Sequence, residues 1–185
     1  ALGRMNDAEL SDDRRIDAAV LRALLEADLA NARFRSWEMP LNSDSNFWTY
    51  LDASSSLQSA DEYRHYLSRM ADIPRYFDQH MANMRAGLAR GFSVPKISLA
   101  GRDQSIASFV TRDAQSNSFY AAFRTMPATL TSAEQQALRA EAAQIIERAV
   151  IPAYRKLLDF YRSEYVPKTR TSLSVQAMPQ GAEYY

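Results

Sequence analysis

The sequence predicts an all-α fold: an irregular multi-helix bundle with one long C-terminal helix over about residues 131–165 and a non-helical tail. Apolar side chains recur at spacings of three and four along most of the chain, and two Ser/Thr-x-x-Glu capping boxes mark helix starts. With 185 residues, 46% hydrophobic and 24% charged, the chain is long enough to bury a core of its own. Residues 1–185 are therefore expected to form a single helical domain that ends in an extended tail at 166–185.

The first predicted helix covers residues 12–38, with Ser11 or Asp12 as its N-cap. Its charged side chains fall mostly opposite an apolar stripe, which is typical of a helix that packs on one side. The stripe consists of Ile16, Val20, Leu24, Ala27 and Ala30 or Asn31.

Residues 40–59 break this spacing and predict a long loop. The polar residues responsible are Asn42, Ser43, Asp44, Ser45 and the run Ser54-Ser55-Ser56. Large apolar side chains lie among them, namely Phe47, Trp48, Tyr50 and Leu51. Because exposed apolar surface is unfavourable in water, we expect these side chains to pack against helices, as a lid on the core rather than as a site for a ligand or partner.

A second helix is expected to start near Ser59, which forms a capping box with Glu62. Pro74 is expected either to kink this helix or to open the next one, and Gly91 should lie just beyond its C-terminus. The residues at helical spacing are Tyr63, Tyr66, Leu67, Met70, Ile73, Tyr76, Phe77, His80, Met81, Met84 and Leu88.

Two shorter helical segments are expected at residues 94–110 and 117–123. The clearest helix then starts at the Thr131 capping box and runs to about residue 165. At 1.5 Å per residue it spans roughly 50 Å, more than the roughly 40 Å diameter of a compact domain of this size. Either Pro152 bends this helix or the helix outgrows the domain. Its apolar stripe consists of Leu138, Ala142, Ile145, Ala149, Ala153, Leu157, Phe160 and Tyr161.

Composition disfavours several classes of function. Lys and Arg together number 22, as do Asp and Glu, so no net basic field would attract nucleic acid. The 5 glycines form no dinucleotide or phosphate-binding loop, and the absence of cysteine removes disulfides, thiol nucleophiles and cysteine zinc sites. No window of 18 uncharged apolar residues is present, so no membrane span is expected.

Histidine offers one motif with a chemical precedent. Glu62 and His65 have the E-x-x-H spacing that places both side chains on one helix face, as in di-iron carboxylate bundles. Such a site needs a second pair, and the position that would match Glu62 before His80 is Phe77. We therefore interpret Glu62 and His65 as a surface contact, and His80 as a core-edge histidine with a satisfied hydrogen bond.

The other candidate motifs have ordinary structural interpretations. No G-x-S-x-G nucleophile motif is present. The adjacent carboxylates Asp12 and Asp13 would not face one another on a helix and are interpreted as its charged start. Gly87 and Gly91 have G-x-x-x-G spacing, but flanking arginines indicate a helix end rather than a membrane dimer. The sequence thus predicts no catalytic and no metal-ligating residue in this chain, and it identifies no substrate-binding residue.

Two blocks of the chain resemble one known family. The first comprises residues 63–76, followed by 83–91 and Pro95. The second is a P-x-Y-x-x-L-x-x-F pattern at 152–160 that continues through Arg170 to a P-x-G-x-x-Y-Y pattern at 179–185. In this order the blocks are similar to the N-terminal half of the bacterial proteins called domain of unknown function 885. The chain departs from the family at Thr171-Ser172-Leu173, where the family usually has a glycine soon after the arginine.

The resemblance implies a much longer, mostly helical protein that is similar to zinc metallopeptidases of the gluzincin type. In that type, an H-E-x-x-H helix in the C-terminal half binds zinc and activates the attacking water. This chain contains no such motif. The resemblance therefore implies that the chain is a helical scaffold or cleft wall of a zinc-dependent hydrolase of peptides, inactive alone, with the zinc held by the other half.

Two alternatives stay open. The chain could be a self-standing helical interaction module that uses an exposed stripe of the long helix and the aromatic loop, by which we mean the loop of residues 40–59 with its large apolar side chains. It could also be an autonomous enzyme, although the few histidines and the lack of cysteine disfavour this alternative. Because the long helix and the tail lack a covering element, we expect them to pair with a second copy. The sequence starts at Ala1 without a charged-plus-apolar leader, so export from a bacterial cell stays open if a leader was removed.

Overall fold

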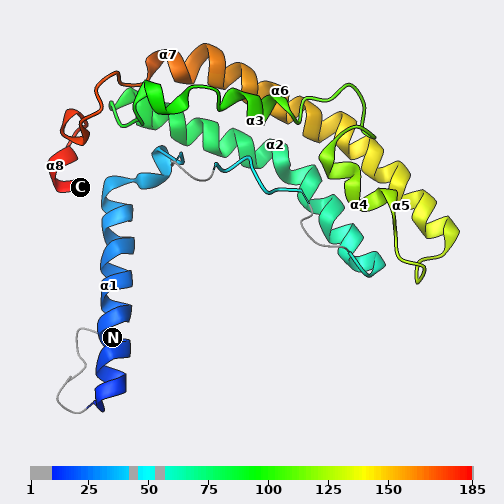
Figure 1. Ribbon diagram of the computed structural model, residues 1–185, viewed down its shortest axis with the longest axis horizontal. Helices are drawn as coiled ribbons and strands as arrows, with labels where there is room; N and C mark the ends of the chain where they lie inside the picture. Colours follow the sequence, from blue (N-terminus) through cyan, green and yellow to red (C-terminus); the bar gives the residue numbers. More distant parts are fainter. Residues whose placement is uncertain (1–9, 42–45, 53–56, 185) are drawn as a thin grey trace.

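A computed structural model describes residues 10–41, 46–52 and 57–184, and the regular structure in these ranges is helical, as the sequence predicts. Figure 1 shows α2 and the long helix that begins with α5 lying side by side in an arched body, while α1 projects from one end of it. The predicted loop residues 42–45 and 54–56 and the final Tyr185 lie outside the described ranges.

Helix α1 (Asp12–Phe34) is shorter than the predicted range of 12–38. It ends because Arg35 adopts a left-handed conformation with φ of 52°, and the chain continues as one 3₁₀ turn, η3 (Ser36–Glu38). Ser11 occupies the N-cap position, without a side-chain cap hydrogen bond. Within α1 the buried side chains are those of Ala18 and Phe34, so this helix is an arm rather than part of the bundle.

Helix α2 (Ala60–Ala89) begins at the predicted Ser59 capping box and continues through Pro74 without a break. Its end is a Schellman motif, in which the Phe92 N–H donates to the Gly87 carbonyl at 2.8 Å and the Gly91 N–H donates to the Leu88 carbonyl at 3.1 Å. Gly91 has a φ of 76°, which a residue without a Cβ adopts readily. The predicted C-terminal role of Gly91 is therefore confirmed.

Short helical turns carry the chain back along the bundle. They are η4 (Lys96–Leu99), α3 (Asp103–Ala107), η5 (Ser118–Tyr120) and α4 (Ala121–Arg124). The prediction of one helix over 94–110 is wrong, because Gly101 has a φ of 75° and separates η4 from α3. The prediction over 117–123 is confirmed, and Asn117 caps the segment by accepting the Phe119 N–H at 3.1 Å.

The long helix runs without interruption through α5 (Ser132–Ile145), η6 (Ile146–Val150), α6 (Ile151–Phe160), η7 (Tyr161–Tyr165) and α7 (Val166–Lys168). It starts at the predicted Thr131 capping box and extends beyond 165. The segments η6 and η7 are π-helical turns, and each ends two residues before a proline, Pro152 and Pro167. Proline lacks an N–H and crowds the carbonyl one turn earlier, so the wider turn lets the helix pass each proline.

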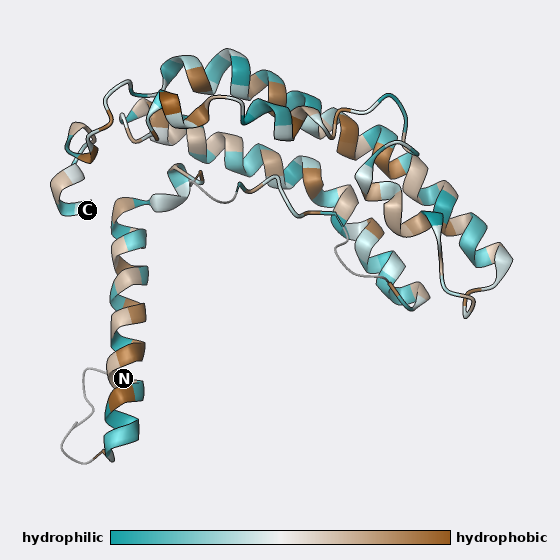
Figure 2. Cartoon of the chain, viewed as in Figure 1, coloured by the Kyte–Doolittle hydropathy of each residue, from teal (hydrophilic) through white to brown (hydrophobic). Residues whose placement is uncertain are grey.

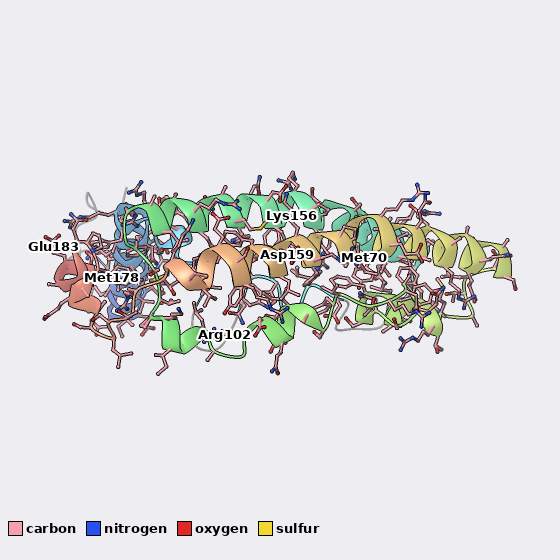
Figure 3. The ribbon with its side chains drawn as sticks, turned by 90° about the horizontal axis from the view of Figure 1, so that it is seen from above. Met70, Arg102, Lys156, Asp159, Met178 and Glu183 are labelled. Atoms are coloured by element: carbon pink, nitrogen blue, oxygen red, sulfur yellow. The ribbon has the colours of Figure 1, made fainter. Side chains whose placement is uncertain are left out.

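Helix α2 and the long helix are parallel. Lys156 donates to Asp78 at 2.7 Å across a separation of 78 residues, and Arg85 donates to Glu164 at 2.7 and 2.8 Å across 79 residues. Because the separation in sequence between the contacting residues is nearly constant, the two helices run in the same direction. Figure 3 shows them from above, with Lys156 between them. Parallel neighbours need a return connection, which residues 90–131 provide.

The apolar stripe of the long helix is buried against α2 and the short helices. Six residues of the predicted stripe are buried, namely Leu138, Ala142, Ala153, Leu157, Phe160 and Tyr161. The predicted Ile145 and Ala149 are only partly buried, and their neighbours Ile146 and Val150 are buried instead. The expectation that this stripe stays exposed is wrong, because α2 and the return segment cover it along its length. The exposed apolar stripe belongs instead to α1.

As predicted, the large side chains of the aromatic loop pack against the core, with one exception. Trp48 has no exposed surface; its Nε1 donates to Ser105 Oγ at 3.0 Å, and its carbonyl accepts the Tyr154 hydroxyl at 2.7 Å. Phe47 and Leu51 are partly buried against the core. Tyr50 is the exception: it is 80% exposed and has a φ of 59°, because the turn directs its side chain into solvent.

The tail is not wholly extended. It contains a 3₁₀ turn, η8 (Val175–Ala177), and a short helix, α8 (Gly181–Tyr184). Tyr184 meets Phe34 and Phe92 edge-on, at ring-centroid distances of 5.4 and 5.3 Å. The tail thus packs on the junction of α1 and α2, and Figure 3 places Glu183 beside α1.

Candidate functional site

The E-x-x-H pair lies at the start of α2, where Glu62 and His65 are both exposed. Glu62 Oε2 accepts the backbone N–H groups of Gln58 and Ser59 at 2.5 and 3.3 Å, so this carboxylate closes the capping box. Over the described part of the chain, no three Asp, Glu or His side chains converge in a way that could hold a metal ion. The E-x-x-H spacing is therefore explained by helix capping.

His80 lies at the edge of the core, but its predicted hydrogen bond is wrong. Its Nδ1 atom is buried without a hydrogen-bond partner among the described residues. The imidazole is instead stacked on Phe47, with centroids 4.1 Å apart and planes 9° apart, and it meets Tyr76 edge-on at 4.5 Å. Burial lowers the pKa of His80, which favours the neutral ring that stacks here. Sequence could not indicate this arrangement, because Phe47 comes from a loop.

The other two motifs have structural roles. Asp12 and Asp13 are exposed at the start of α1, where Asp12 pairs with Arg15 within the same helix. Gly91 ends α2, whereas Gly87 permits a close approach that sequence did not predict: a Cβ there would lie 2.5 Å from the Glu38 carbonyl oxygen. The G-x-x-x-G pattern thus serves a helix end and a contact with η3.

A buried ion pair that the sequence did not indicate fixes the base of the α1 arm. Glu38 is 4% exposed and pairs with Arg90, while Arg35 Nη1 lies 3.3 Å from its other oxygen. Arg90 also donates to the Phe34 carbonyl at 2.6 Å and lies 4.0 Å from the Phe92 ring centroid. A single guanidinium therefore joins the end of α1, η3 and the end of α2.

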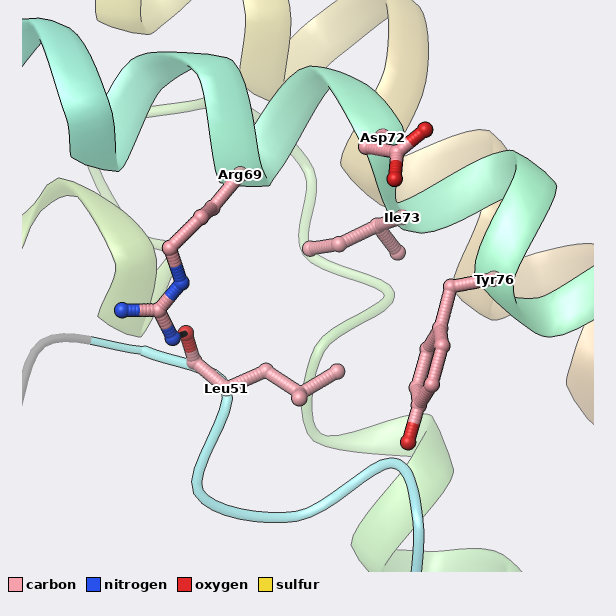
Figure 4. Close-up of a pocket in the computed structure, with 5 residues that line it drawn as sticks. All are labelled: Leu51, Arg69, Asp72, Ile73 and Tyr76. Atoms are coloured by element: carbon pink, nitrogen blue, oxygen red, sulfur yellow. Dashed lines mark hydrogen bonds between the residues drawn. The ribbon is translucent and has the colours of Figure 1, made fainter.

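Several pockets indent the described surface, one of them beside the aromatic loop and another beside η4. The first has a volume of about 170 Å³ and lies between one face of α2 and the aromatic loop (Figure 4). Its lining residues are Leu51, Arg69, Asp72, Ile73 and Tyr76. The second, of about 450 Å³, lies between η4, α3 and the end of the long helix. There Arg162 is bound to Asp103 at 2.7 Å, and burial raises the pKa of Tyr161 to about 12, so its hydroxyl remains a donor to the Leu99 carbonyl.

The α1 arm carries an exposed apolar face, which Figure 2 shows as brown segments along a helix whose sides no other described element covers. We define this α1 face by six side chains that are between 43% and 69% exposed: Ile16, Val20, Leu21, Leu24, Leu25 and Leu29. Contiguous apolar surface of this kind marks a site of interaction in soluble proteins. The described residues thus offer an exposed apolar face and pockets as binding surfaces. No described helix is long and apolar enough to cross a membrane.

Comparison with solved structures finds a likeness of fold. The protein named as a putative lipoprotein from Colwellia psychrerythraea superposes with a TM-score of 0.70 at 18% sequence identity. The match covers 80% of this chain and 26% of that one, so this chain corresponds to a minor part of the longer structure. Comparison with characterised protein sequences gives no significant match.

A family model settles the relationship that the two sequence blocks indicated, because it matches the entire sequence rather than the blocks alone. The chain belongs, over residues 1–185, to the bacterial protein family of unknown function DUF885.

Proposed function

We propose that this chain is the N-terminal helical part of a longer zinc-dependent, metallopeptidase-like hydrolase that acts on peptides. In this proposal the chain is the scaffold and one wall of the peptide-binding cleft, and the rest of the protein supplies the H-E-x-x-H segment and the zinc ion. Membership of DUF885 and the small share of the solved neighbour that the chain covers support a longer protein.

The α1 face is the observation that carries the proposal. Helix α1 has 23 residues, which corresponds to about 35 Å of helix. An isolated helix of this length is marginal in water, because most helical stability in proteins comes from tertiary packing of the apolar face. The arm meets its own body at its C-terminal end, through η3, Arg90 and the tail, and no described element covers the α1 face, which supports a partner outside the described residues.

In the proposed arrangement, the α1 face packs on the part of the protein that follows Tyr185. The buried Glu38–Arg90 pair supports this, since it fixes the direction of the arm before any partner binds. A rigid arm and a parallel helix pair would together form two sides of a cleft. The C. psychrerythraea neighbour is named as a lipoprotein, which supports the further proposal that this protein is exported.

The test uses the complete gene product, purified with and without zinc. We expect one zinc ion per molecule, hydrolysis of unstructured peptides that a chelator abolishes, and no hydrolysis by residues 1–185 alone. A Leu24→Glu/Leu29→Glu variant should weaken the packing of the α1 face and lower the melting temperature of the complete protein. The control is Glu26→Lys, an exposed position on the other side of α1.

Two outcomes would contradict parts of the proposal separately. A complete gene product near 20.9 kDa would show that no further part exists to hold zinc. A longer product that neither binds zinc nor hydrolyses peptides would contradict the peptidase activity and leave the proposed scaffold role unchanged.

The second candidate function is a self-standing interaction module, and the same α1 face favours it. In that case two copies would bury their α1 faces against each other, rather than pair through the long helix and tail. Sedimentation of residues 1–185 distinguishes the two: a stable dimer that Leu24→Glu/Leu29→Glu dissociates supports the module, and a monomer supports the scaffold.

A further inference from the structure

The pocket beside α2 has a composition that suits one class of small ligand. In Figure 4, Arg69 and Tyr76 lie on opposite sides of the opening, Leu51 lies across it, and the Ile73 side chain points into it. Leu51 and Ile73 belong to the core or pack against it, so the pocket has a fixed apolar base. We propose that this pocket binds a small carboxylate that carries an apolar or aryl group, with the Arg69 guanidinium holding the carboxylate.

The charges at the opening favour an anion. Arg69 Nη2 makes a long hydrogen bond of 3.4 Å to the Leu51 carbonyl, and no carboxylate in the described residues lies within ion-pair distance of it. Most of its five donors therefore have no partner in the part of the chain that the structure describes. Asp72, at the edge of the pocket, already accepts hydrogen bonds from Nε and Nη2 of Arg75, with Nε 2.7 Å from Oδ1. These three residues together leave one positive charge at the opening.

The ion pair between Arg75 and Asp72 should stay intact when an anion binds to Arg69. The hydrogen bond from Arg75 lowers the pKa of Asp72, so this carboxylate is ionised and occupied at neutral pH. Burial raises the pKa of Tyr76, so its phenol stays neutral and does not add a negative charge. Asp52, which directly follows Leu51 in the chain, is not among the residues that line the pocket.

The volume restricts the ligand to a single small group. The pocket volume of about 170 Å³ is smaller than the roughly 300–1,000 Å³ of pockets for drug-sized ligands. A phenyl ring or a branched aliphatic group fits beside Leu51 and Ile73, while a planar guanidinium can bind a carboxylate through two parallel hydrogen bonds. A carboxylate of this kind occurs as a free acid or as the C-terminal residue of a peptide.

The test measures binding to residues 1–185 by NMR titration, with 3-phenylpropionate for the free acid and N-acetyl-L-phenylalanine for the peptide end. Each probe is paired with its uncharged carboxamide. We expect saturable shifts at the Leu51 and Ile73 amides and the Tyr76 ring, with the acids binding about tenfold more tightly than the amides, as expected for a charge-assisted hydrogen bond. Tighter binding of the N-acetyl compound would identify a peptide end, and tighter binding of the simple acid would identify a free acid.

Substitutions of Arg69 test how much its charge and its hydrogen-bonding geometry each contribute to binding of the acids. Arg69→Gln should weaken binding of both acids about tenfold and leave the amides unchanged, while Arg69→Lys should give an intermediate affinity because it keeps the charge but loses the two parallel hydrogen bonds. The matched control is Arg64→Gln on the same helix, whose guanidinium binds Asp61 at 2.7 Å outside the pocket. Arg69 and Arg64 are both exposed, so neither change should alter the circular dichroism spectrum.

The proposal is overturned if the acids and amides bind equally, if Arg69→Gln leaves acid binding unchanged, or if no probe gives saturable shifts in the pocket. The result does not depend on the proposed peptidase, because the probes are not hydrolysed and no zinc is added. If residues 1–185 bind the acids but the complete protein hydrolyses no peptide, the pocket proposal is supported and only the peptidase proposal is contradicted.

Discussion

Arg90 donates a hydrogen bond to the carboxylate of Glu38 across 52 residues of sequence, and this buried pair joins the α1 arm to the end of α2. The Glu38 side chain is 5% exposed and that of Arg90 is 21% exposed, so both charges are largely removed from water. Such a pair is costly to break, because the remaining charge stays buried without compensation.

Arg90→Met should therefore lower the free energy of unfolding by about 3 kcal/mol, measured by urea denaturation. The double variant Glu38→Gln/Arg90→Met should lose less than the sum of the single variants, because the two groups interact directly. The control is Arg75→Met, which breaks the exposed pair with Asp72 and should have a much smaller effect. Additive losses at Glu38 and Arg90 would show that the pair does not stabilise the junction.

Gly87→Ala should destabilise the protein, although alanine normally favours a helix over glycine. The new Cβ would lie 2.5 Å from the Glu38 carbonyl oxygen and 2.8 Å from that of Phe92, and neither backbone group can move cheaply. We expect a loss of about 1–3 kcal/mol, typical of overpacking. Gly101→Ala is the control, because nothing lies within 4 Å of its Cβ and only its φ of 75° opposes the change. A stabilised Gly87→Ala variant would mean that η3 does not approach α2 this closely.

The Arg85–Glu164 pair should make stability depend on acidity. The hydrogen bond from Arg85 lowers the pKa of Glu164, so the pair stabilises the fold above the unfolded pKa of about 4.3. Its contribution is lost as the pH falls through the lower pKa of the folded state. The difference in unfolding free energy between wild type and Glu164→Gln should therefore shrink from pH 7 to about pH 3. Glu147→Gln, at an exposed position on the same helix, should show no such change.

Helix α1 should open locally before the rest of the chain unfolds, since its sides have little tertiary cover. At concentrations where residues 1–185 sediment as a monomer, trypsin should cleave after Arg14 and Arg15 before it cleaves after Arg64 or Arg75 in α2. Hydrogen exchange should likewise be fast in α1 and slow in α2 and the long helix. Equal protection of α1 and α2 under these conditions would contradict the exposed arm.

Local features of the fold could be predicted because their causes lie within a few residues. The capping boxes at Ser59 and Thr131 fix helix starts through bonds that span three residues, and Gly91 ends α2 through its own backbone conformation. The break at Gly101 and the end of α1 at Arg35 were missed, since a single left-handed residue in a periodic segment leaves little trace in sequence.

The candidate sites were beyond what sequence predicts, because each combines distant segments. The pocket joins Leu51 of the loop to Arg69 and Tyr76 of α2, and His80 stacks on Phe47 of the same loop. The histidine and carboxylate motifs that sequence did single out are used for capping and core packing. Spacing along one helix identifies residues on a common face, but it does not identify what the face meets.

By itself, the sequence determined the all-helical class, the starts of both long elements of the bundle, the burial of Trp48 and the relationship to DUF885. Only the tertiary structure decided which apolar stripe is covered. The stripe of the long helix is buried because α2 runs parallel to it, whereas the stripe of α1 stays exposed because Arg35 turns that helix away from the body. Hydrophobic periodicity records that a helix has an apolar face, and the partner of that face is set by packing between residues far apart in the chain.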